Sequence, residues 1–315
     1  MLTLDAQAVA AALPYDQLIA KLDAAFAGDV TVPVRTHHRV AVPGGSDGTL
    51  LLMPAWQTGQ HIGVKVATVF PDNAGRALPA VFASYLLVSA ETGVPAAFID
   101  GTELTLRRTA AASALASKYL SREDAGCLLM VGTGNLAPHL IAAHAAVRPI
   151  RTVRIWGRRK HAAEALAAAL VALPFSVDVI ADLEKAVAGA DILSCATLSK
   201  EPLIRGAWLR SGQHVDLVGA FRPDMREADA DAIRLANVYV DTKEGAMSEA
   251  GELVQALSRG VIDEAHIRGT LRELAMGTAP GRRDPGEITV FKSVGTALED
   301  LAAAELALQN AGRKD

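Results

Sequence analysis

The sequence predicts an α/β protein of two domains, one built on a parallel sheet and the other on a mostly antiparallel α+β arrangement. The chain has 315 residues, whereas a single hydrophobic core stops growing at roughly 250 to 300 residues. Residues 30–100 carry short β-branched runs separated by turn sequences, which favours an antiparallel meander. From Gly126 onward, apolar runs of strand length alternate with helical runs, which is typical of parallel strands joined by helical crossovers.

The composition indicates a soluble globular protein. Half of the residues are hydrophobic (50%), 21% are charged and the net charge is −4, so no nucleic-acid surface is expected. The N-terminus lacks the basic segment of a signal peptide. No apolar stretch approaches the roughly 20 residues that a membrane-spanning helix needs. Cys127 and Cys195 lie in apolar runs without metal-ligand spacing, so we expect no disulfide, no metal site and a cytoplasmic location.

The first domain is expected to begin with helices and to continue as strands. Charged residues interrupt the apolar residues of positions 1–28, which predicts a pair of amphipathic helices. A long helix is predicted at residues 102–120, with Thr102 as its N-cap and Glu103 in its first turn. The strands between them are predicted at "VTVPVRTHHRVAV", "TLLLMPAW", "HIGVKVATVF", "AVFASYLLVSAETG" and "VPAAFID".

The second domain alternates strands and helices. Its predicted strands are "CLLMVG", "RTVRIWG", "VDVIA", "DILSCAT", "QHVDLVGA" and "ANVYVDT". The alternation is complete by residue 290, yet the chain continues into a long amphipathic helix within "ITVFKSVGTALEDLAAAELALQNAG". We therefore expect this last helix to return to the first domain. The predicted boundaries are 1–119 with 291–315 for the first domain and 120–290 for the second.

A glycine turn follows the first strand of the second domain. In "GTGNLA", Gly132 permits a tight turn, Gly134 lets the backbone approach a pyrophosphate, and Ala137 allows close helix packing. The alternative is a strand-to-helix turn that merely needs a positive φ. The position between an apolar strand and a helix favours dinucleotide binding on a Rossmann domain. We assign to the cofactor site Gly132, Thr133, Gly134, Asn135 and Leu136.

The second strand ends in cations rather than in an acid. NAD-selective domains carry a carboxylate about 20 residues past the glycines, where it accepts hydrogen bonds from the ribose. Here that place holds "IWGRRKH", and Arg158 and Arg159 suit a 2′-phosphate instead. The alternative is that these are solvated residues at a helix start. NADPH is therefore favoured over NADH.

Three cations of the first domain have apolar or small neighbours. Lys65 lies between valines in a predicted strand, and burial of an ammonium group is costly without a partner. Arg35 and Arg108 have similar surroundings, and the three together would hold a substrate carboxylate. The alternative for each is a salt bridge to Asp or Glu, or a side chain that extends to water.

The motifs that carry a resemblance run in order across nearly the whole chain: "VRT", "MPAW", "GVKVATVFPDN", "RRTAAASALASKYL", "VGTGNLAPH", "GAFRPDMREAD" and "FKSVGTALEDLAAA". In these motifs the chain resembles the ornithine cyclodeaminase and mu-crystallin family. The resemblance implies NAD(P)(H) binding on the Rossmann domain, and a homodimer formed through a discontinuous, substrate-binding domain built from both chain ends. It also implies that Arg35, Lys65 and Arg108 hold the substrate carboxylate and carry catalysis. By the same assignment Met53 and Arg222 contact substrate, and Thr197, Gly219 and Ser293 contact cofactor.

Departures from the family pattern separate the possible activities. Cyclodeaminases resemble one another in acidic residues at positions where this chain has Leu51 and Phe221, and in a lysine where it has Met225. Leu and Phe cannot accept a proton, so ornithine cyclisation is disfavoured. Arg222, in the loop "RPDMREAD", is a candidate for the substrate pocket or a surface residue paired with Asp224 or Glu227.

The leading hypothesis is NADPH-dependent reduction of a cyclic imine carboxylate, pyrroline-2-carboxylate or piperideine-2-carboxylate, to the L-imino acid. The proton that reduction requires could come from Lys65, water or bulk acid. The alternatives are ornithine cyclodeaminase activity, oxidative deamination of a small amino acid as in alanine dehydrogenases, and a non-catalytic crystallin-like binding protein.

Several other residues have simpler interpretations. Trp56 and Phe221 could wall the substrate ring, but such aromatic residues more often belong to a core. His37 and His38 alternate on a strand, so they cannot both face one site. Ser293 could equally be the N-cap of the last helix.

Overall fold

The computed structural model describes residues 1–76 and 78–312 and divides into two compact units. Unit 1 contains residues 1–109 together with the chain from residue 296 onward, and unit 2 contains residues 110–295. The sequence-based boundaries were 119/120, which lies in the same helix as 109/110, α3 (Gly101–Leu120), and 290/291, which lies five residues before 295/296.

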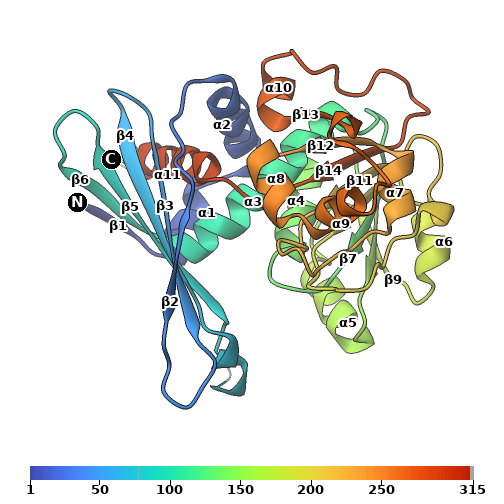
Figure 1. Ribbon diagram of the computed structural model, residues 1–315, viewed down its shortest axis with the longest axis horizontal. Coiled ribbons are helices and arrows are strands. Elements are labelled where there is room, and N and C mark those ends of the chain that lie inside the picture. Colours follow the sequence, from blue (N-terminus) through green and yellow to red (C-terminus); the bar gives the residue numbers. More distant parts are fainter. Residues whose placement is uncertain (77, 313–315) are drawn as a thin grey trace. The chain divides into compact units, whose positions relative to one another are not determined.

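Unit 1 is built on a six-stranded sheet in the order β1-β6-β5-β4-β3-β2 (Figure 1). Only the pair β1 and β6 is parallel, and the four remaining pairs are antiparallel, as the β-branched runs predicted. The strands are β1 (Leu2–Leu4), β2 (Thr36–Val40), β3 (Gly48–Trp56), β4 (His61–Val69), β5 (Val81–Ser89) and β6 (Pro95–Asp100). The other elements are α1 (Ala6–Ala12), α2 (Tyr15–Ala27), the 3-10 helix η1 (Pro71–Arg76), the first part of α3, and α11 (Ala297–Ala311).

The two faces of this sheet differ in burial. Because side chains alternate along a strand and pair across it, one face presents Met53, Lys65 and Tyr85 in a single row, and all three are buried. Helix α11 packs on this face against β3, β4 and β5, and it also contacts α2 (Figure 1). The C-terminal helix therefore does return to the first unit. The opposite face leaves large apolar side chains exposed: Ile62, Val66, Phe82 and Phe98.

The start of α3 differs from the prediction that Thr102 is the N-cap. The helix begins at Gly101, and the Oδ1 atom of Asp100 accepts the hydrogen bond of the Glu103 amide at 2.7 Å. Strand β6 runs into the helix without a loop, so its last residue takes the capping role. The Thr102 hydroxyl instead accepts a hydrogen bond from the Ala83 amide on the neighbouring strand.

Unit 2 is a Rossmann-like unit on an eight-stranded, wholly parallel sheet in the order β13-β12-β14-β11-β10-β7-β8-β9. Its strands are β7 (Cys127–Val131), β8 (Thr152–Trp156), β9 (Ser176–Val179), β10 (Ile192–Cys195), β11 (His214–Leu217), β12 (Asn237–Val240), β13 (Ile267–Thr270) and β14 (Thr289–Lys292). The chain leaves β7 for β8 and β9 on one side and returns to β10 on the other. This reversal between β7 and β10 is the switch point at which such sheets bind ligands.

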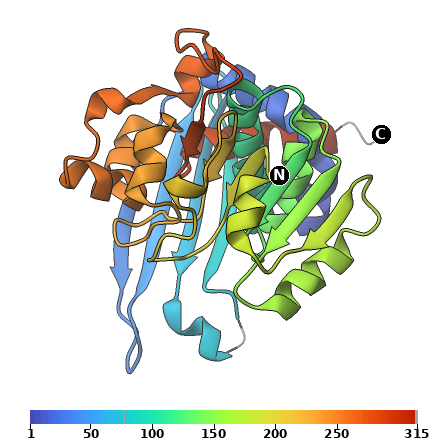
Figure 2. The ribbon, with the colours of Figure 1, turned by 90° about the vertical axis from the view of Figure 1, so that its right-hand side faces the viewer.

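The helices of unit 2 follow its strands. They are α4 (Ala137–Val147), α5 (Lys160–Ala169), α6 (Leu183–Ala188), η2 (Gly206–Trp208), α7 (Ala230–Leu235), α8 (Lys243–Glu249), α9 (Gly251–Ser258), η3 (Glu264–His266) and α10 (Leu271–Ala275). Helix α5 packs on β8 and β9 (Figure 2). The central strands are buried and form one core with the helices beside them. Both cysteines are free thiols. Within the part of the chain that the structure describes, no helix is long and apolar enough to cross a membrane.

The turn that follows β14 is fixed by a buried carboxylate. The Oδ2 atom of Asp241 accepts hydrogen bonds from the amides of Val294 at 2.8 Å and Gly295 at 2.7 Å. Gly295 has φ +84°, which only glycine adopts without strain. Of the two roles that the sequence offered for Ser293, the N-cap of the last helix is excluded, because α11 begins at Ala297 with Thr296 as its N-cap.

Candidate functional site

The glycine turn has the geometry that a bound dinucleotide requires. Gly132 has φ +123°, and a Cβ atom there would lie 2.6 Å from the Ala196 carbonyl oxygen. A Cβ atom on Gly134 would meet nothing within 4 Å, so the backbone at that residue is open to a ligand. Both interpretations of the turn therefore hold, since it needs a positive φ and also leaves space for close approach.

Helix α4 starts without a side-chain cap. Its N-cap residue, Leu136, has no acceptor group. The Ala137 amide donates to the Gly134 carbonyl at 3.0 Å and Pro138 has no N–H group, so the helix dipole is the feature of this terminus that attracts an anion such as phosphate. The residues Thr133, Gly134 and Asn135 precede the helix and are partly or fully exposed.

A pocket lies at the carboxyl ends of β7, β8 and β10, at the switch point. Its lining includes Gly132, Thr133, Trp156, Gly157, Arg158, Arg159, Thr197 and Ser199. Arg158 and Arg159 are exposed, and neither makes an ion pair or side-chain hydrogen bond with any residue that the structure describes. Lys160 instead forms a surface ion pair with Glu164. The residues present therefore fit a dinucleotide with a phosphate beside the two arginines.

The loops after β10 and β11 are joined by a buried carboxylate that the sequence analysis did not identify. Glu227 accepts hydrogen bonds from the amides of Thr197 at 2.5 Å and Gly219 at 2.7 Å. A Cβ atom on Gly219 would lie 2.0 Å from the Thr197 carbonyl oxygen, so the two loops are in backbone contact. Thr197 and Gly219, both predicted cofactor residues, are thus brought together.

Two further buried charged residues, Glu252 and Lys292, lie next to Glu227. Its amide donates to the Oε1 atom of Glu252 on α9 at 2.7 Å, and the Oε2 atom of Glu252 lies 3.4 Å from the Nζ atom of Lys292 on β14. Burial raises the pKa of Glu227 to about 7; Lys292 opposes this rise and Glu252 adds to it. Ser293, the next residue after Lys292, is also buried.

In unit 1, Lys65 and Arg108 converge on two acidic residues of α11. The Lys65 Nζ atom lies 2.8 Å from Oδ1 and 2.7 Å from Oδ2 of Asp300. The Arg108 Nε atom donates to Oδ1 of the same carboxylate at 2.9 Å, and its Nη1 atom donates to Glu299 at 2.5 Å. All four side chains are buried. The sequence analysis left salt bridges open for these cations but did not name their partners.

The cluster shifts the pKa values of its members. Burial, assisted by the charge of Arg108, lowers the pKa of Lys65 to about 8, although Asp300 opposes this. Burial would also lower the pKa of Arg108, but Asp300 and Glu299 outweigh it and raise the value. Burial raises and the two cations lower the pKa of Asp300, and the lowering prevails. Lys65 is therefore the group of the cluster that can lose its proton under mildly alkaline conditions.

Met53 is the cross-strand neighbour of Lys65 and is buried beside it. Arg35 is half-buried and directly precedes β2, whose first residue, Thr36, pairs with Leu52. The β2–β3 ladder begins at Thr36, so Arg35 lies just outside the paired strand. Lys65 and Arg108 are thus brought together by one sheet face and the helix that follows β6, and Arg35 directly precedes the edge strand of the same sheet.

Arg222 is placed differently. Its guanidinium is exposed and forms two hydrogen bonds with Asp224, at 3.0 Å and 2.8 Å, and Lys200 contacts the same carboxylate. Of the two interpretations offered by the sequence, the structure shows pairing with Asp224. Phe221, beside it, is also exposed.

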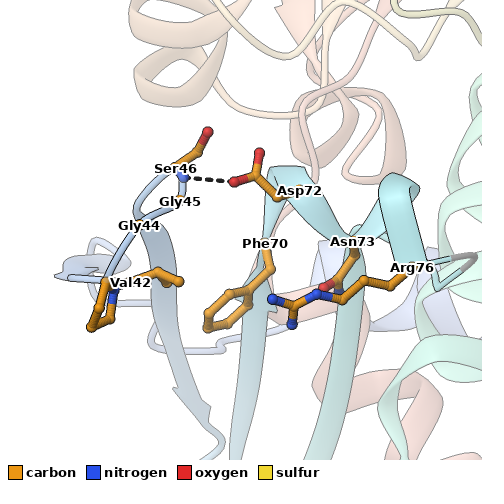
Figure 3. A pocket seen from close by; sticks show the side chains of 9 residues that line it. Val42, Gly44, Gly45, Ser46, Phe70, Asp72, Asn73 and Arg76 are labelled. Carbon is orange, nitrogen blue, oxygen red and sulfur yellow. Dashed lines mark hydrogen bonds between the residues drawn. The ribbon is translucent and has the colours of Figure 1, made fainter.

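A second pocket lies in unit 1 between the β2–β3 connection and η1, and Figure 3 shows its lining. Asp72 accepts a hydrogen bond from the Ser46 amide at 2.6 Å, and this bond lowers the pKa of the carboxyl group. None of the predicted site residues lines the pocket. We therefore assign a structural role to the residues that line this pocket: they hold the tip of the β2–β3 hairpin against η1.

No group of three or more His, Cys, Asp or Glu residues in the described ranges has the arrangement of a metal site. His37 and His38 lie side by side on the exposed strand β2. His144, on α4, is buried between Ser117 and Asp216, so packing is its role.

Comparison with known proteins gives a consistent result. Residues 2–315 match the model of the ornithine cyclodeaminase/mu-crystallin family. The chain is 45% identical to Protein SAR DEFICIENT 4 of Arabidopsis thaliana, with 88% of this chain and 86% of the relative covered. It is 39% identical to a Delta(1)-pyrroline-2-carboxylate reductase of Colwellia psychrerythraea, with 96% and 97% covered.

Solved structures agree with this result. The reductase of the same name from Thermococcus litoralis, in complex with NADH and L-proline, has a TM-score of 0.92 at 35% identity, with 99% of this chain and 97% of that chain covered. An archaeal alanine dehydrogenase dimer with bound NAD has a TM-score of 0.91 at 31% identity, with 100% and 97% covered.

The buried cluster yields a stability prediction. Asp300→Asn leaves Lys65 and Arg108 without a shared carboxylate, so we expect the free energy of unfolding to fall by about 3–5 kcal/mol. Asp47→Asn removes the partner of the exposed Arg39 and should cost about 0–1 kcal/mol. Urea denaturation of both variants measures the difference, and equal losses would contradict the role assigned to the buried cluster.

Proposed function

The chain belongs to the ornithine cyclodeaminase/mu-crystallin family and is an NAD(P)-dependent oxidoreductase, and we propose that it reduces a cyclic imine carboxylate to the L-imino acid. Pyrroline-2-carboxylate and piperideine-2-carboxylate are the proposed substrates. The observation that carries this proposal is the buried pair Lys65 and Arg108 on one sheet face, held in place by Glu299 and Asp300.

The cations suit a carboxylate ligand. Asp300 and Glu299 occupy the Nε and Nη1 atoms of Arg108, while its Nη2 atom makes no hydrogen bond with a residue that the structure describes. A guanidinium with a donor still available can bind a further carboxylate oxygen. Lys65 carries three donors on one nitrogen and is fixed by the same Asp300. Both side chains are therefore preorganised, which reduces the entropy that substrate binding must overcome.

The residues at which the chain departs from the cyclodeaminase pattern favour an imine over an α,ω-diamino acid as the substrate. Leu51 and Phe221 offer no proton acceptor for a second amino group, and Met225 is buried and uncharged. A cyclic imine needs a carboxylate anchor and an apolar surrounding for its ring. The named relatives at high coverage include pyrroline-2-carboxylate reductases, one of them solved with L-proline.

When bound, the reduced nicotinamide supplies the hydride. The protein contributes orientation: the anchored carboxylate fixes the adjacent C=N carbon, and a fixed geometry replaces a bimolecular encounter. Reduction also consumes one proton at the ring nitrogen. Lys65, with its lowered pKa, is the group of the cluster that can either release that proton or keep the positive charge that attracts the carboxylate.

The proposed cofactor is NADPH. Arg158 and Arg159 follow β8, the second strand of the unit, at the place where NAD-selective domains have an acid, and their exposed guanidinium groups line the pocket. The relatives solved with NADH or NAD bound show that the family accommodates the non-phosphorylated form.

We also propose a homodimer formed through the face of the unit 1 sheet that lies opposite helix α11. Exposed Ile62, Val66, Phe82 and Phe98 belong to adjacent strands on that face, and contiguous exposed apolar side chains mark interaction surfaces. The archaeal alanine dehydrogenase, whose fold this chain shares, is itself a dimer.

The activity prediction concerns Arg108. NADPH oxidation should depend on pyrroline-2-carboxylate, and Arg108→Ala should lower kcat/KM about 10- to 100-fold, because a charged hydrogen bond contributes about 1.5–3 kcal/mol. The exposed Arg39→Ala is the matched control and should remain close to wild type. Pyruvate reduction that requires ammonia would instead support an amino-acid dehydrogenase, and ornithine-dependent NAD reduction would support a cyclodeaminase. NADPH binding without turnover on any of these substrates would support a binding protein.

The cofactor prediction concerns Arg158 and Arg159. Replacement of both with Ala should raise KM for NADPH at least about 10-fold and leave KM for NADH nearly unchanged, because only the 2′-phosphate loses its charged partners. Steady-state kinetics with each cofactor measure the two values. Equal changes for NADPH and NADH would contradict the assignment.

The pH prediction concerns Lys65. Its ammonium form is present below the pKa of about 8 and is lost above it, so kcat/KM should decline as pH rises through that value. Lys65→Arg keeps the charge at high pH and should move the alkaline limb upward, whatever its effect on the maximum. An alkaline limb at the same pH in both proteins would assign it to another group.

A further inference from the structure

Both oxygens of the Glu227 carboxylate are used within the protein. The side chain is fully buried, and each oxygen accepts one backbone amide, Thr197 on Oε1 and Gly219 on Oε2. A carboxylate is the side chain that can accept from two amides without presenting a donor of its own. Glutamine would turn an N–H group toward one of the two amides.

The two amides come from different loops, which follow neighbouring strands of the parallel sheet. Thr197 follows β10 and lines the pocket at the switch point, and Gly219 follows β11. Glu227 also closes its own loop, because Gly219 is the first residue of the segment 219–227. That segment includes Phe221, at which the chain departs from the cyclodeaminase pattern, and Arg222, which the family resemblance assigned to the substrate.

The backbone of Glu227 is itself fixed by a buried residue of α9. Its amide donates to Glu252 on α9, and Glu252 lies beside the buried Lys292 on β14. A Cβ atom on Gly251 would lie 1.8 Å from the Met225 carbonyl oxygen, so α9 packs directly on the segment 219–227. The carboxylate is thus a fixed point to which the carboxyl-end loops of β10 and β11 are attached.

Burial of a carboxylate is costly, and hydrogen bonds or a charged partner must offset that cost. The side-chain oxygens of Glu227 bond to Thr197, which lines the dinucleotide pocket, and to Gly219 on the adjacent loop, and Glu227 itself does not line the pocket. We propose that Glu227 is a positioning residue: it sets the affinity for the cofactor by holding the Thr197 and Gly219 loops in contact at the switch point, without touching the cofactor. This inference rests on dinucleotide binding at the switch point, and it is independent of which substrate is reduced.

The proposal also predicts that cofactor affinity depends on pH, through the protonation state of Glu227. A protonated carboxyl group gains an O–H donor and loses the charge that strengthens both N–H···O bonds, so the ionised form holds the two loops more strongly. The groups that face Glu227 are Glu252 from α9, Lys292 from β14 and Cys195 from β10. The raised pKa of Glu227, about 7, puts the change within a measurable range. Cofactor affinity should therefore decrease as pH falls from about 8 to about 6.

The test is a fluorescence titration of wild type and Glu227→Gln with NADPH and with NADH. Loss of one buried hydrogen bond should raise Kd about 10-fold, and equally for both cofactors, because Glu227 has no contact with the 2′-phosphate. Glu201→Gln is the matched control, since Glu201 is an exposed acid of the same loop region that pairs with Arg226. It should bind both cofactors as wild type does. In steady state, KM for cofactor should rise while kcat at saturation stays within about threefold.

Three outcomes would overturn the proposal. They are unchanged affinity in Glu227→Gln, an effect confined to NADPH, and a fall in kcat with KM unchanged. If Glu227→Gln does not fold, as judged by circular dichroism, the NADH affinity of wild type over the same pH range decides, and a pH-independent Kd contradicts the proposal. Wild type that binds neither cofactor would overturn both this inference and the oxidoreductase assignment, whereas cofactor binding without imine reduction would affect the substrate assignment alone.

Discussion

The unit 1 fold depends on one electrostatic constraint, which is that two cations buried against its sheet need carboxylates. Lys65 on β4 and Arg108 on α3 would be prohibitively costly in an apolar core without partners. Glu299 and Asp300 supply them from α11, at least 191 positions further along the chain. The discontinuous unit follows from this, because the chain must return after completing its parallel sheet. The same ion cluster that closes the unit contains the two cations that we propose as the anchor of a substrate carboxylate.

Unit 2 follows a similar principle at its switch point. The strand order brings the ends of β7 and β10 together, and the glycine turn leaves open space beside Gly134 there. Buried acids then fix the loops around this position: Glu227 joins the loops of β10 and β11, and Asp241 fixes the turn after β14. Both units thus use carboxylates that are hidden from solvent to hold loops or charged groups in a defined geometry.

The sequence predicted the features that have a local signature. The glycine turn between an apolar strand and a helix predicted the positive φ of Gly132 and the turn at the end of β7, and a lysine between valines marked Lys65 as unusual. The partners could not be predicted, because Asp300 and Glu227 occur in segments whose acidic residues are typical of a solvated helix face or loop. Only tertiary packing buries them. One predicted N-cap was misplaced by two residues, since Asp100 rather than Thr102 caps α3, and Thr296 rather than the alternative Ser293 caps α11. Strand β13 was missed because its four residues include Arg268 and Gly269.

The most direct test of the account is whether ligand binding requires a carboxylate. Inhibition of imine-dependent NADPH oxidation by L-proline can be compared with inhibition by pyrrolidine, which has the same ring without the carboxylate. If the buried cations anchor the substrate, L-proline competes with the imine and pyrrolidine has no effect at the same concentration. Equal competition by both compounds would show that the ring alone is recognised, and it would contradict the assignment of Lys65 and Arg108 as the substrate anchor.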